Sequence, residues 1–319
     1  MVKYATKQLL LLIPKLLIIS LAVFLVLQAL PGDPISRSVP LDVYKYMNET
    51  QLEALRESLG LNRPWYMQYF SWLGNMLQGN FGYSQVNGSD VGQLIADRLP
   101  ATMALAAFAL IIGNLLGLLF GYLAATHQNS WLDYSSTTVS VVGISVPQFF
   151  FSIIILMLFA VKLRWFPTGG RLTPGDGGFW DRINHMILPG LCMALGMVCN
   201  LMRYTRGSML DVMNKDYVKT ARSKGIAEWK VNLKHTFRNA LIPVMTTLIF
   251  RLVALVGGTV IIETIFSYPG MGAMIMDALS GGDMPVVMVC TMLTSFVALC
   301  CSCLLDTVTA ALDPRVRLD

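Results

Sequence analysis

The chain has 319 residues, of which 55% are hydrophobic and only 13% are charged. Soluble domains carry about a quarter of charged residues, so this composition excludes an ordinary soluble protein. Three windows contain no Asp, Glu, Lys or Arg, namely 101–125, 134–161 and 285–305. Because a bilayer core about 30 Å thick takes roughly 20 apolar residues as a helix, each window predicts a membrane-spanning helix.

The first 98 residues predict one span and a small external cap. We expect an N-terminal elbow and first transmembrane helix over 1–30, retained because the apolar run is long and ends without a small-residue cleavage site. Residues 31–98 are too long for a turn and form an extracytoplasmic segment. It combines a surface helix at 42–59 with an aromatic-rich interfacial helix around 65–72.

The rest of the chain predicts a permease-like core over 99–305 and a cytoplasmic tail over 306–319. The core helices lie at about 101–125, 134–161, 186–202, 240–262 and 285–305, and Pro147 is placed to kink the second of them. With the first span this gives an all-α membrane protein of six transmembrane helices. Placing both termini inside puts 14 of the 24 Lys and Arg on the cytoplasmic side and nine outside, which favours that orientation.

Several chemical functions lack the residues they need. The six cysteines lie in or beside predicted spans without a zinc-ligand or disulfide pattern, so no metal site is predicted. No His-Glu-x-x-His and no phosphate-binding Gly-x-x-x-x-Gly-Lys-Ser/Thr occurs. An intramembrane enzyme is therefore disfavoured, and any ATP must be bound by a partner.

The predicted cytoplasmic loop 203–238 carries nine Lys and Arg against three acids. A short helix begins at Asp216 and ends before Gly225, with an acid at its start and cations near its end. A second helix restarts at Glu228, with Leu233, Phe237 and Leu241 on an apolar face. Two interpretations remain open, an elbow that receives force from a soluble partner and a basic loop that binds anionic lipid headgroups.

The sequence of this loop resembles the cytoplasmic loop of ABC-importer permeases. The matching residues are Asp216–Tyr217–Val218–Lys219–Thr220–Ala221–Arg222–Ser223–Lys224–Gly225, followed by Arg238–Asn239–Ala240–Leu241–Ile242–Pro243. Lys219–Thr220–Ala221 replaces the generic Glu-Ala-Ala, a departure that the peptide-type subfamily shares. Five more stretches are similar to the dipeptide/oligopeptide (peptide/nickel) family, namely Pro31–Gly32–Asp33–Pro34, Leu59–Gly60–Leu61, Phe81–Gly82–Tyr83–Ser84, Glu263–Thr264–Ile265–Phe266–Ser267–Tyr268–Pro269–Gly270–Met271–Gly272 and Asp313–Pro314–Arg315–Val316–Arg317.

The resemblance implies a type I ABC-importer permease in the bacterial plasma membrane, the permease of the pair with the larger extracytoplasmic segment. It implies as partners a second permease, two ATPase subunits that bind ATP and Mg, and an extracytoplasmic solute-binding protein, together with membrane lipid and no nucleic acid. The chain itself needs no cofactor. The family's coupling helix falls on Asp216, Tyr217, Lys219, Thr220, Ala221, Arg222, Lys224 and Gly225. Peptides, nickel complexes and glutathione all remain open as solutes.

Arg251 is the sharpest candidate for the solute pathway. A charge near mid-membrane costs at least ~2.5–3.5 kcal/mol, so three interpretations stay open: it faces a watery path, it pairs with an acid of this chain or of the neighbouring permease, or it snorkels and thins the bilayer locally. Asn114, Gln148 and Thr259 are further candidates, although interhelical hydrogen bonds explain them equally well. A secondary transporter or channel is the alternative class, but the predicted spans contain no Asp or Glu for ion coupling.

Overall fold

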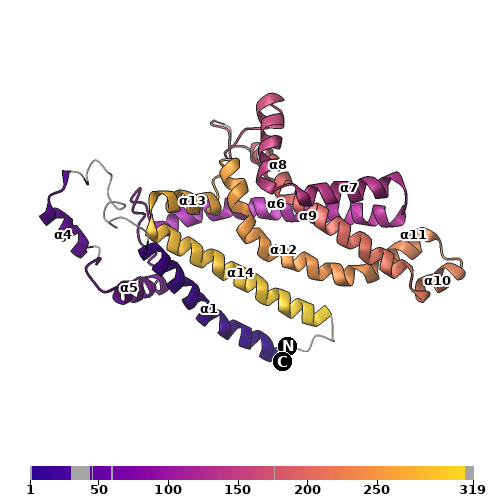
Figure 1. The fold of residues 1–319 in the computed structure, drawn as a ribbon, viewed down its shortest axis with the longest axis horizontal. Helices are drawn as coiled ribbons and strands as arrows, with labels where there is room; N and C mark the ends of the chain where they lie inside the picture. Colours follow the sequence, from indigo (N-terminus) through magenta and orange to yellow (C-terminus); the bar gives the residue numbers. More distant parts are fainter. Residues whose placement is uncertain (1, 30–43, 45, 59, 176, 313–319) are drawn as a thin grey trace. The chain divides into compact units, whose positions relative to one another are not determined.

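A computed structural model describes residues 2–29, 44, 46–58, 60–175 and 177–312, without the side chains of 2–7, 9, 246–259 and 305–312. The motifs at 31–34 and 313–317 lie outside the described residues. The helices are labelled in Figure 1, and the chain divides into two compact units. The first comprises 103–268 with the chain from 300 onward, and the second comprises 2–102 with 269–299.

The regular elements of the described residues are helical, apart from an isolated bridge between Tyr83 and Asp90. They are, in chain order, α1 (Val2–Gln28), α4 (Glu49–Ser58), α5 (Trp65–Leu77), α6 (Val91–Thr126), α7 (Trp131–Ser145), α8 (Gln148–Ile155), η1 (Leu156–Lys162), α9 (Phe179–Met213), α10 (Asp216–Ser223), α11 (Glu228–Lys230), η2 (Val231–Phe237), α12 (Arg238–Ile265), α13 (Met271–Gly281) and α14 (Met284–Leu312). The elements η1 and η2 are π-helical.

Four of the described helices, α1, α6, α9 and α14, are long and apolar enough to cross a membrane. A fifth span results if α7 and the α8–η1 helix are taken together. The helix α12 covers the fifth predicted span, 240–262, and the side chains of 246–259, half of the helix, lie outside the described set. The helices run past the predicted windows because charged residues end an apolar window but do not end backbone hydrogen bonding. For this reason α9 extends well beyond 186–202 at both ends.

The third predicted span is sharply bent rather than kinked. Its two halves, 131–145 and 148–162, meet at 106°. Pro147 lies at the break, and Val146 before it has extended backbone with ψ 125°. A proline disfavours helical geometry in the residue before it, which ends α7 at this point. This bend opens space beside α9.

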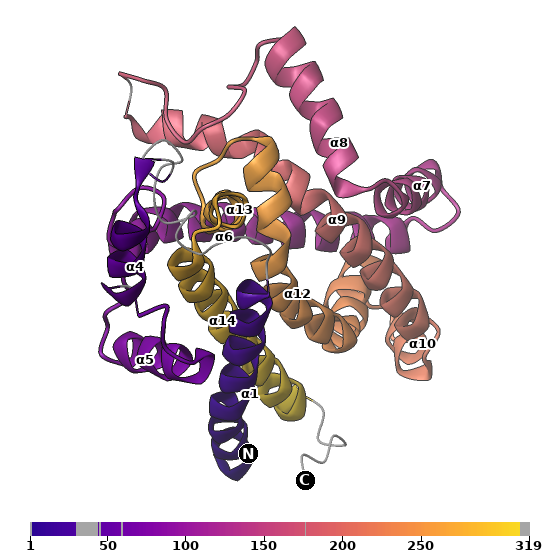
Figure 2. The same cartoon turned by 60° about the vertical axis from the view of Figure 1, so that its left-hand side comes forward.

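The helix α9 is central to the first unit. It contacts α7, α8, α12 and the η2 segment, and Figure 2 shows it beside α12. It also meets α6 through Gly113, Gly117 and Gly121, which we call the glycine stripe. These glycines face Met197, Leu201 and Thr205 of α9 in turn. Glycines four residues apart let two membrane helices approach closely, which favours association by van der Waals contact.

In the second unit α5 packs against α1. The Tyr69 hydroxyl lies 2.8 Å from Ser20 Oγ, and the Tyr69 ring meets Phe24 edge to face. Thus the aromatic stretch predicted as interfacial buries Tyr69 and leaves Trp65 and Phe70 exposed. The predicted surface helix is shorter than 42–59, since α4 covers only Glu49–Ser58.

A buried carboxylate of the second unit holds the loop that precedes α6. Asp283 precedes α14, is 3% exposed and accepts hydrogen bonds from the Ser84 hydroxyl and the Gln85 backbone N–H. The Gln85 side chain in turn accepts from the Met284 N–H. Satisfying a buried carboxylate in this way offsets its desolvation, so the loop around 84–85 is fixed to the start of the last span.

Substitution Gly117→Ala tests the glycine stripe. A Cβ at this position would lie 2.7 Å from the Leu201 Cβ, so α6 and α9 must move apart to admit it. We expect a loss of about 1–3 kcal/mol of stability, the usual cost of overpacking, measured as thermal unfolding in detergent. Gly196→Ala on α9 is the matched control, because a Cβ there meets nothing within 4 Å. Equal unfolding temperatures for the two variants would contradict the close approach.

Candidate functional site: the elbow and the cavities beside α9

The helix α10 ends in a motif that fixes the direction of the next segment. Gly225 has φ +70°, which glycine adopts without steric cost. Its N–H donates to the Arg222 carbonyl at 2.9 Å, and the Ile226 N–H donates to the Ala221 carbonyl at 3.4 Å. This pair of bonds is the Schellman arrangement, which satisfies carbonyls that a helix end otherwise leaves free. Gly225 is therefore the corner between the two arms of the elbow, residues 216–237.

The elbow is anchored by a small apolar cluster. Val218 and Ala221 of α10 are buried against Val231 of η2, with Val212 and Ile226 packed around them. Burying a valine side chain stabilises by about 1.5–3 kcal/mol relative to exposure. The cluster therefore makes α10 and the segment after it a connected body.

The opposite face of α10 is polar and exposed. The Lys219 ammonium lies 3.0 Å from Asp216, and the Arg222 guanidinium donates to both carboxylate oxygens of Glu228, the shorter bond being 2.7 Å. Exposed pairs of this kind are worth about 0–1 kcal/mol, so they orient side chains more than they hold the fold. The remaining predicted coupling residues, Tyr217, Thr220 and Lys224, are also exposed, whereas Ala221 is buried.

The second arm differs from the predicted α-helix. Only Glu228–Lys230 is α-helical, and Val231–Phe237 is π-helical before α12 begins. The predicted apolar face is wrong at Leu233, which is 52% exposed, because the wider π turn rotates Val231, Asn232 and Thr236 inward instead. The Asn232 Oδ1 and Thr236 Oγ1 atoms are buried with no hydrogen-bond partner. This arm is thus less completely satisfied than α10.

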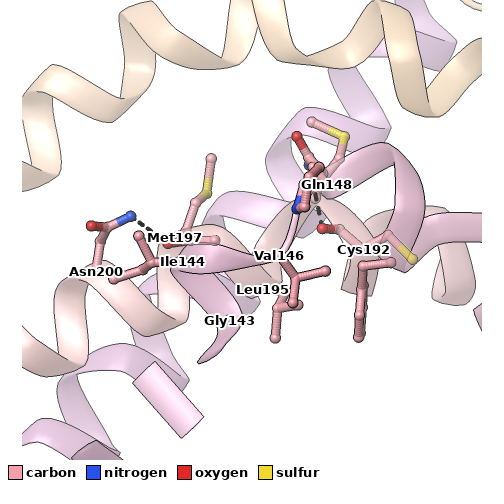
Figure 3. Close-up of a pocket in the computed structure, with 12 residues that line it drawn as sticks. Gly143, Ile144, Val146, Gln148, Cys192, Leu195, Met197 and Asn200 are labelled. Atoms are coloured by element: carbon pink, nitrogen blue, oxygen red, sulfur yellow. Dashed lines mark hydrogen bonds between the residues drawn. The ribbon is translucent and has the colours of Figure 1, made fainter. Parts of the chain in front are cut away.

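A cavity of about 350 Å³ lies at the bend between α7 and α8 (Figure 3). Its walls are mostly apolar, with Gln148 and Asn200 as polar members. Both amide groups donate to carbonyls of α9, Gln148 to Cys192 at 3.3 Å and Asn200 to Gly196 at 2.9 Å. Their side-chain oxygens have no donor among the described residues. The cavity therefore offers two hydrogen-bond acceptors on an apolar wall.

A second cavity, of about 290 Å³, shares Phe151, Cys192 and Leu195 with the first and has an almost wholly apolar lining. Of the predicted pathway residues, Gln148 lines the first cavity. It also donates a hydrogen bond to α9, which is the structural role that the sequence left open beside the pathway role. Asn114 lines neither cavity, and its buried Oδ1 has no partner. The side chains of Arg251 and Thr259 lie outside the described residues.

After α12 the chain forms a turn that is hydrogen-bonded to the loop before α9. Glu263 is fully buried, and its carbonyl accepts from the Tyr268 N–H at 2.8 Å. The Gly170 N–H donates to the Phe266 carbonyl at 3.1 Å, which ties the loop before α9 to this turn. Burial raises the pKa of the Tyr268 hydroxyl, although the nearby Arg171 acts in the opposite direction. The phenol is thus neutral and serves as a structural group.

The histidines, cysteines and acids of the described residues do not gather into a metal-binding cluster. No three of these side chains come together as metal ligands. His185 is instead bonded within the loop, with Nδ1 3.2 Å from the Gly170 carbonyl and Nε2 3.2 Å from the Thr173 hydroxyl.

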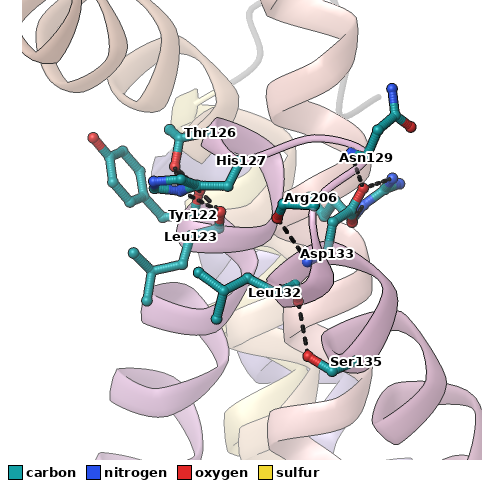
Figure 4. Close-up of polar contacts among 10 residues, drawn as sticks. Tyr122, Leu123, Thr126, His127, Asn129, Leu132, Asp133, Ser135 and Arg206 are labelled. Atoms are coloured by element: carbon teal, nitrogen blue, oxygen red, sulfur yellow. Dashed lines mark hydrogen bonds and ion pairs between the residues drawn. The ribbon is translucent and has the colours of Figure 1, made fainter.

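Two features of the site were missed by sequence reasoning. The glycine stripe was detectable from the four-residue spacing of Gly113, Gly117 and Gly121. The ion pair between Asp133 and Arg206 joins α7 to α9, with Nη2 2.9 Å from Oδ2 (Figure 4). These residues are 73 positions apart, so no local pattern indicates their contact.

The chain matches two families over almost its whole length. Residues 117–318 match "Binding-protein-dependent transport system inner membrane component", and residues 1–106 match the corresponding N-terminal family. Among solved structures it resembles the methionine ABC transporter MetNI in an inward-facing conformation. The TM-score is 0.57 at 14% identity, covering 69% of this chain and 97% of that chain, which shows similarity of fold.

Curated relatives are similar from end to end. The chain is 39% identical to a putative peptide permease protein of Brucella suis over 100% of both chains. It is also 39% identical to the oligopeptide transport system permease protein AppB of Bacillus subtilis, over 99% of this chain and 100% of that protein. It is 36% identical to the glutathione transport system permease protein GsiC of Escherichia coli strain K12, over 99% of each.

Proposed function

The chain belongs to the family of binding-protein-dependent transport system inner membrane components, and from this premise we propose that it forms, with a second permease, the path by which an importer carries peptides or peptide-like solutes. As a family member it is a multi-pass membrane permease of an ABC importer and is not itself an enzyme. The related permeases are named for peptide, oligopeptide and glutathione transport, and these solutes are all amino acids joined by amide bonds. That shared chemistry supports the proposed solute class.

The proposed mechanism rests on the structure of the elbow. The helix α10 has a buried apolar side and an exposed polar side, and its end is fixed by the corner at Gly225. We propose that an ATPase subunit contacts the exposed side through Asp216, Tyr217, Lys219, Thr220, Arg222 and Lys224. A push on that face passes through Val218 and Val231 into η2 and from there into α12.

The remaining partners follow from this arrangement. Two ATPase subunits bind ATP with Mg and supply energy, and an extracytoplasmic binding protein delivers the solute. Both termini and the elbow lie in the cytoplasm, as the distribution of Lys and Arg favours. The segment 31–98 then lies outside as a cap, where its loop at 84–85 is fixed by Asp283.

For the path itself we propose Arg251 as the group that attracts a solute carboxylate. We propose that Asn114, Gln148 and Thr259 also line the path. Gln148 supports this through its place on the wall of the larger cavity, and Asn114 through a buried acceptor without a partner. Arg251 lies in α12, the helix that continues directly from the elbow. Movement of the elbow and exposure of this charge would thereby be linked.

Affinity purification of the chain from mildly solubilised membranes tests the assembly. We expect a second permease and one or two P-loop ATPases to co-purify, and ATP to drive peptide uptake into liposomes once the binding protein is added. Recovery of the chain alone, transporting without ATP, would contradict the proposal and indicate a secondary transporter or channel.

Gly225→Pro tests the corner. Proline cannot adopt φ +70° and lacks the N–H that bonds Arg222, so the local strain is about 1–3 kcal/mol or the corner changes direction. We expect a complex that still assembles and hydrolyses ATP but whose ATP-driven uptake falls to background. Gly60→Pro is a matched control, because Gly60 also has φ +70° and bonds Glu57 at the end of α4. Uptake by both variants at the same level would refute a coupling role.

Arg251→Gln separates the two roles of this charge. If it faces the path, the variant assembles normally, and uptake of peptides with a free carboxylate falls at least about tenfold relative to amidated peptides, about 1.4 kcal/mol. Arg251→Lys should retain most of this preference. Loss of assembly in Arg251→Gln would instead assign the charge to a structural ion pair, and unchanged uptake of both peptides would exclude the path.

A further inference from the structure

A small polar cavity lies between α7 and α9, next to the end of α9 that leads into the elbow. It has a volume of about 40 Å³ and is lined by Ser136, Thr137, Ser140, Met202, Arg203 and Arg206. Two guanidinium groups and three hydroxyls thus surround a space large enough for one water molecule or one phosphate oxygen. A peptide solute does not fit there.

The cavity is held in a fixed geometry by the Asp133–Arg206 pair (Figure 4). Arg206 uses Nε and Nη2 to bond both oxygens of Asp133, which is 2% exposed, and Nη1 has no acceptor among the residues that the structure describes. The Asn129 N–H donates to the same carboxylate at 3.0 Å. Because the Arg206 guanidinium neutralises the Asp133 carboxylate, Asp133 fixes the orientation of Arg206 and does not need Arg203 as a second cation.

The donors that remain point to an anion. Within the described part of the chain, the Arg203 side chain and the Ser136 hydroxyl have no hydrogen bond or ion pair, whereas Ser140 donates to the Cys199 carbonyl and Thr137 is bonded to Asp133. The group formed by Arg203, Arg206 and Asp133 carries one net positive charge. Arginine forks match the spacing of phosphate oxygens, and phosphate accepts from several donors at once.

The surroundings place this cavity at the depth of lipid headgroups. Trp131, Tyr134 and Tyr204 on the two helices are 82%, 62% and 52% exposed. Exposed Trp and Tyr side chains mark the membrane–water interface. One to two turns further along α7, Val139 and Val142 present an apolar exposed surface to which an acyl chain can pack.

We propose that this cavity binds a phosphate group, carried by an anionic membrane phospholipid or as free phosphate. One phosphate oxygen enters between Ser136 and Arg206, and Arg203 binds the oxygens that stay at the mouth. The ligand braces α7 against α9 directly before the elbow. This role goes beyond solute transport and does not depend on which solute is carried.

The test uses the whole complex in phosphatidylcholine nanodiscs, titrated separately with phosphatidylglycerol and with inorganic phosphate. Binding is followed by thermal stabilisation and by mass spectrometry of retained lipid. For Arg203→Gln we expect phosphatidylglycerol to bind about fivefold more weakly, since one basic side chain contributes about 1 kcal/mol at an anionic surface. Arg203→Lys should retain most of the affinity.

The control is Lys234→Gln, which removes an exposed cation from η2 and should leave binding unchanged. Stabilisation by inorganic phosphate alone, with the same dependence on Arg203, would identify free phosphate as the ligand. Equal binding of both ligands by wild type and Arg203→Gln would overturn the proposal. If Arg203→Gln loses a partner subunit, Ser136→Ala is measured in its place, and unchanged binding by that variant overturns the proposal as well.

Discussion

The first unit depends on how closely α6 can approach α9. Lipid tails are as apolar as leucine, so no hydrophobic force drives two helices together within a bilayer, and packing contacts must do so. The glycine stripe allows Leu201 and Thr205 to lie directly on the α6 backbone. Because α9 also contacts α7, α8, α12 and the elbow, its position on α6 sets the position of each of those elements.

Polar contacts then fix α7 and α8 along α9 in antiparallel order. Arg206 binds Asp133, the Ser140 hydroxyl donates to the Cys199 carbonyl, and Gln148 donates to the Cys192 carbonyl. Within the bilayer core the Ser140 and Gln148 groups have no water as an alternative partner, so their bonds favour one register, and the Asp133–Arg206 pair fixes the same register near the start of α7. Pro147 ends α7 directly before Gln148, and the chain bends there by 106°. The cavities of about 350 and 290 Å³ lie beside this bend, between α8 and α9.

The sequence predicted the features that depend on local chemistry. Charge-free windows located the apolar helices, and an acid at Asp216 with Gly225 nine residues later located α10 and its corner. Features that depend on distant partners were not predictable. Pro147 located the bend in the third predicted span but not its angle of 106°, and neither the π turn at Val231–Phe237 nor the helix α13 was predicted. Leu233 shows why a period of four misled, because a π-helix turns its inward face by a different angle per residue than an α-helix does.

The two arms of the elbow differ in how well their polar groups are satisfied, and this difference has a mechanical meaning. In α10 the terminal carbonyls are bonded and the apolar side is buried, so it moves as a body. In η2 two buried oxygens, on Asn232 and Thr236, lack partners, and each such group costs about 1–3 kcal/mol. A rearrangement toward α-helical geometry that found donors for them would recover part of that cost. Under the proposed coupling, η2 is therefore the segment where displacement of α10 is most cheaply converted into rotation of α12.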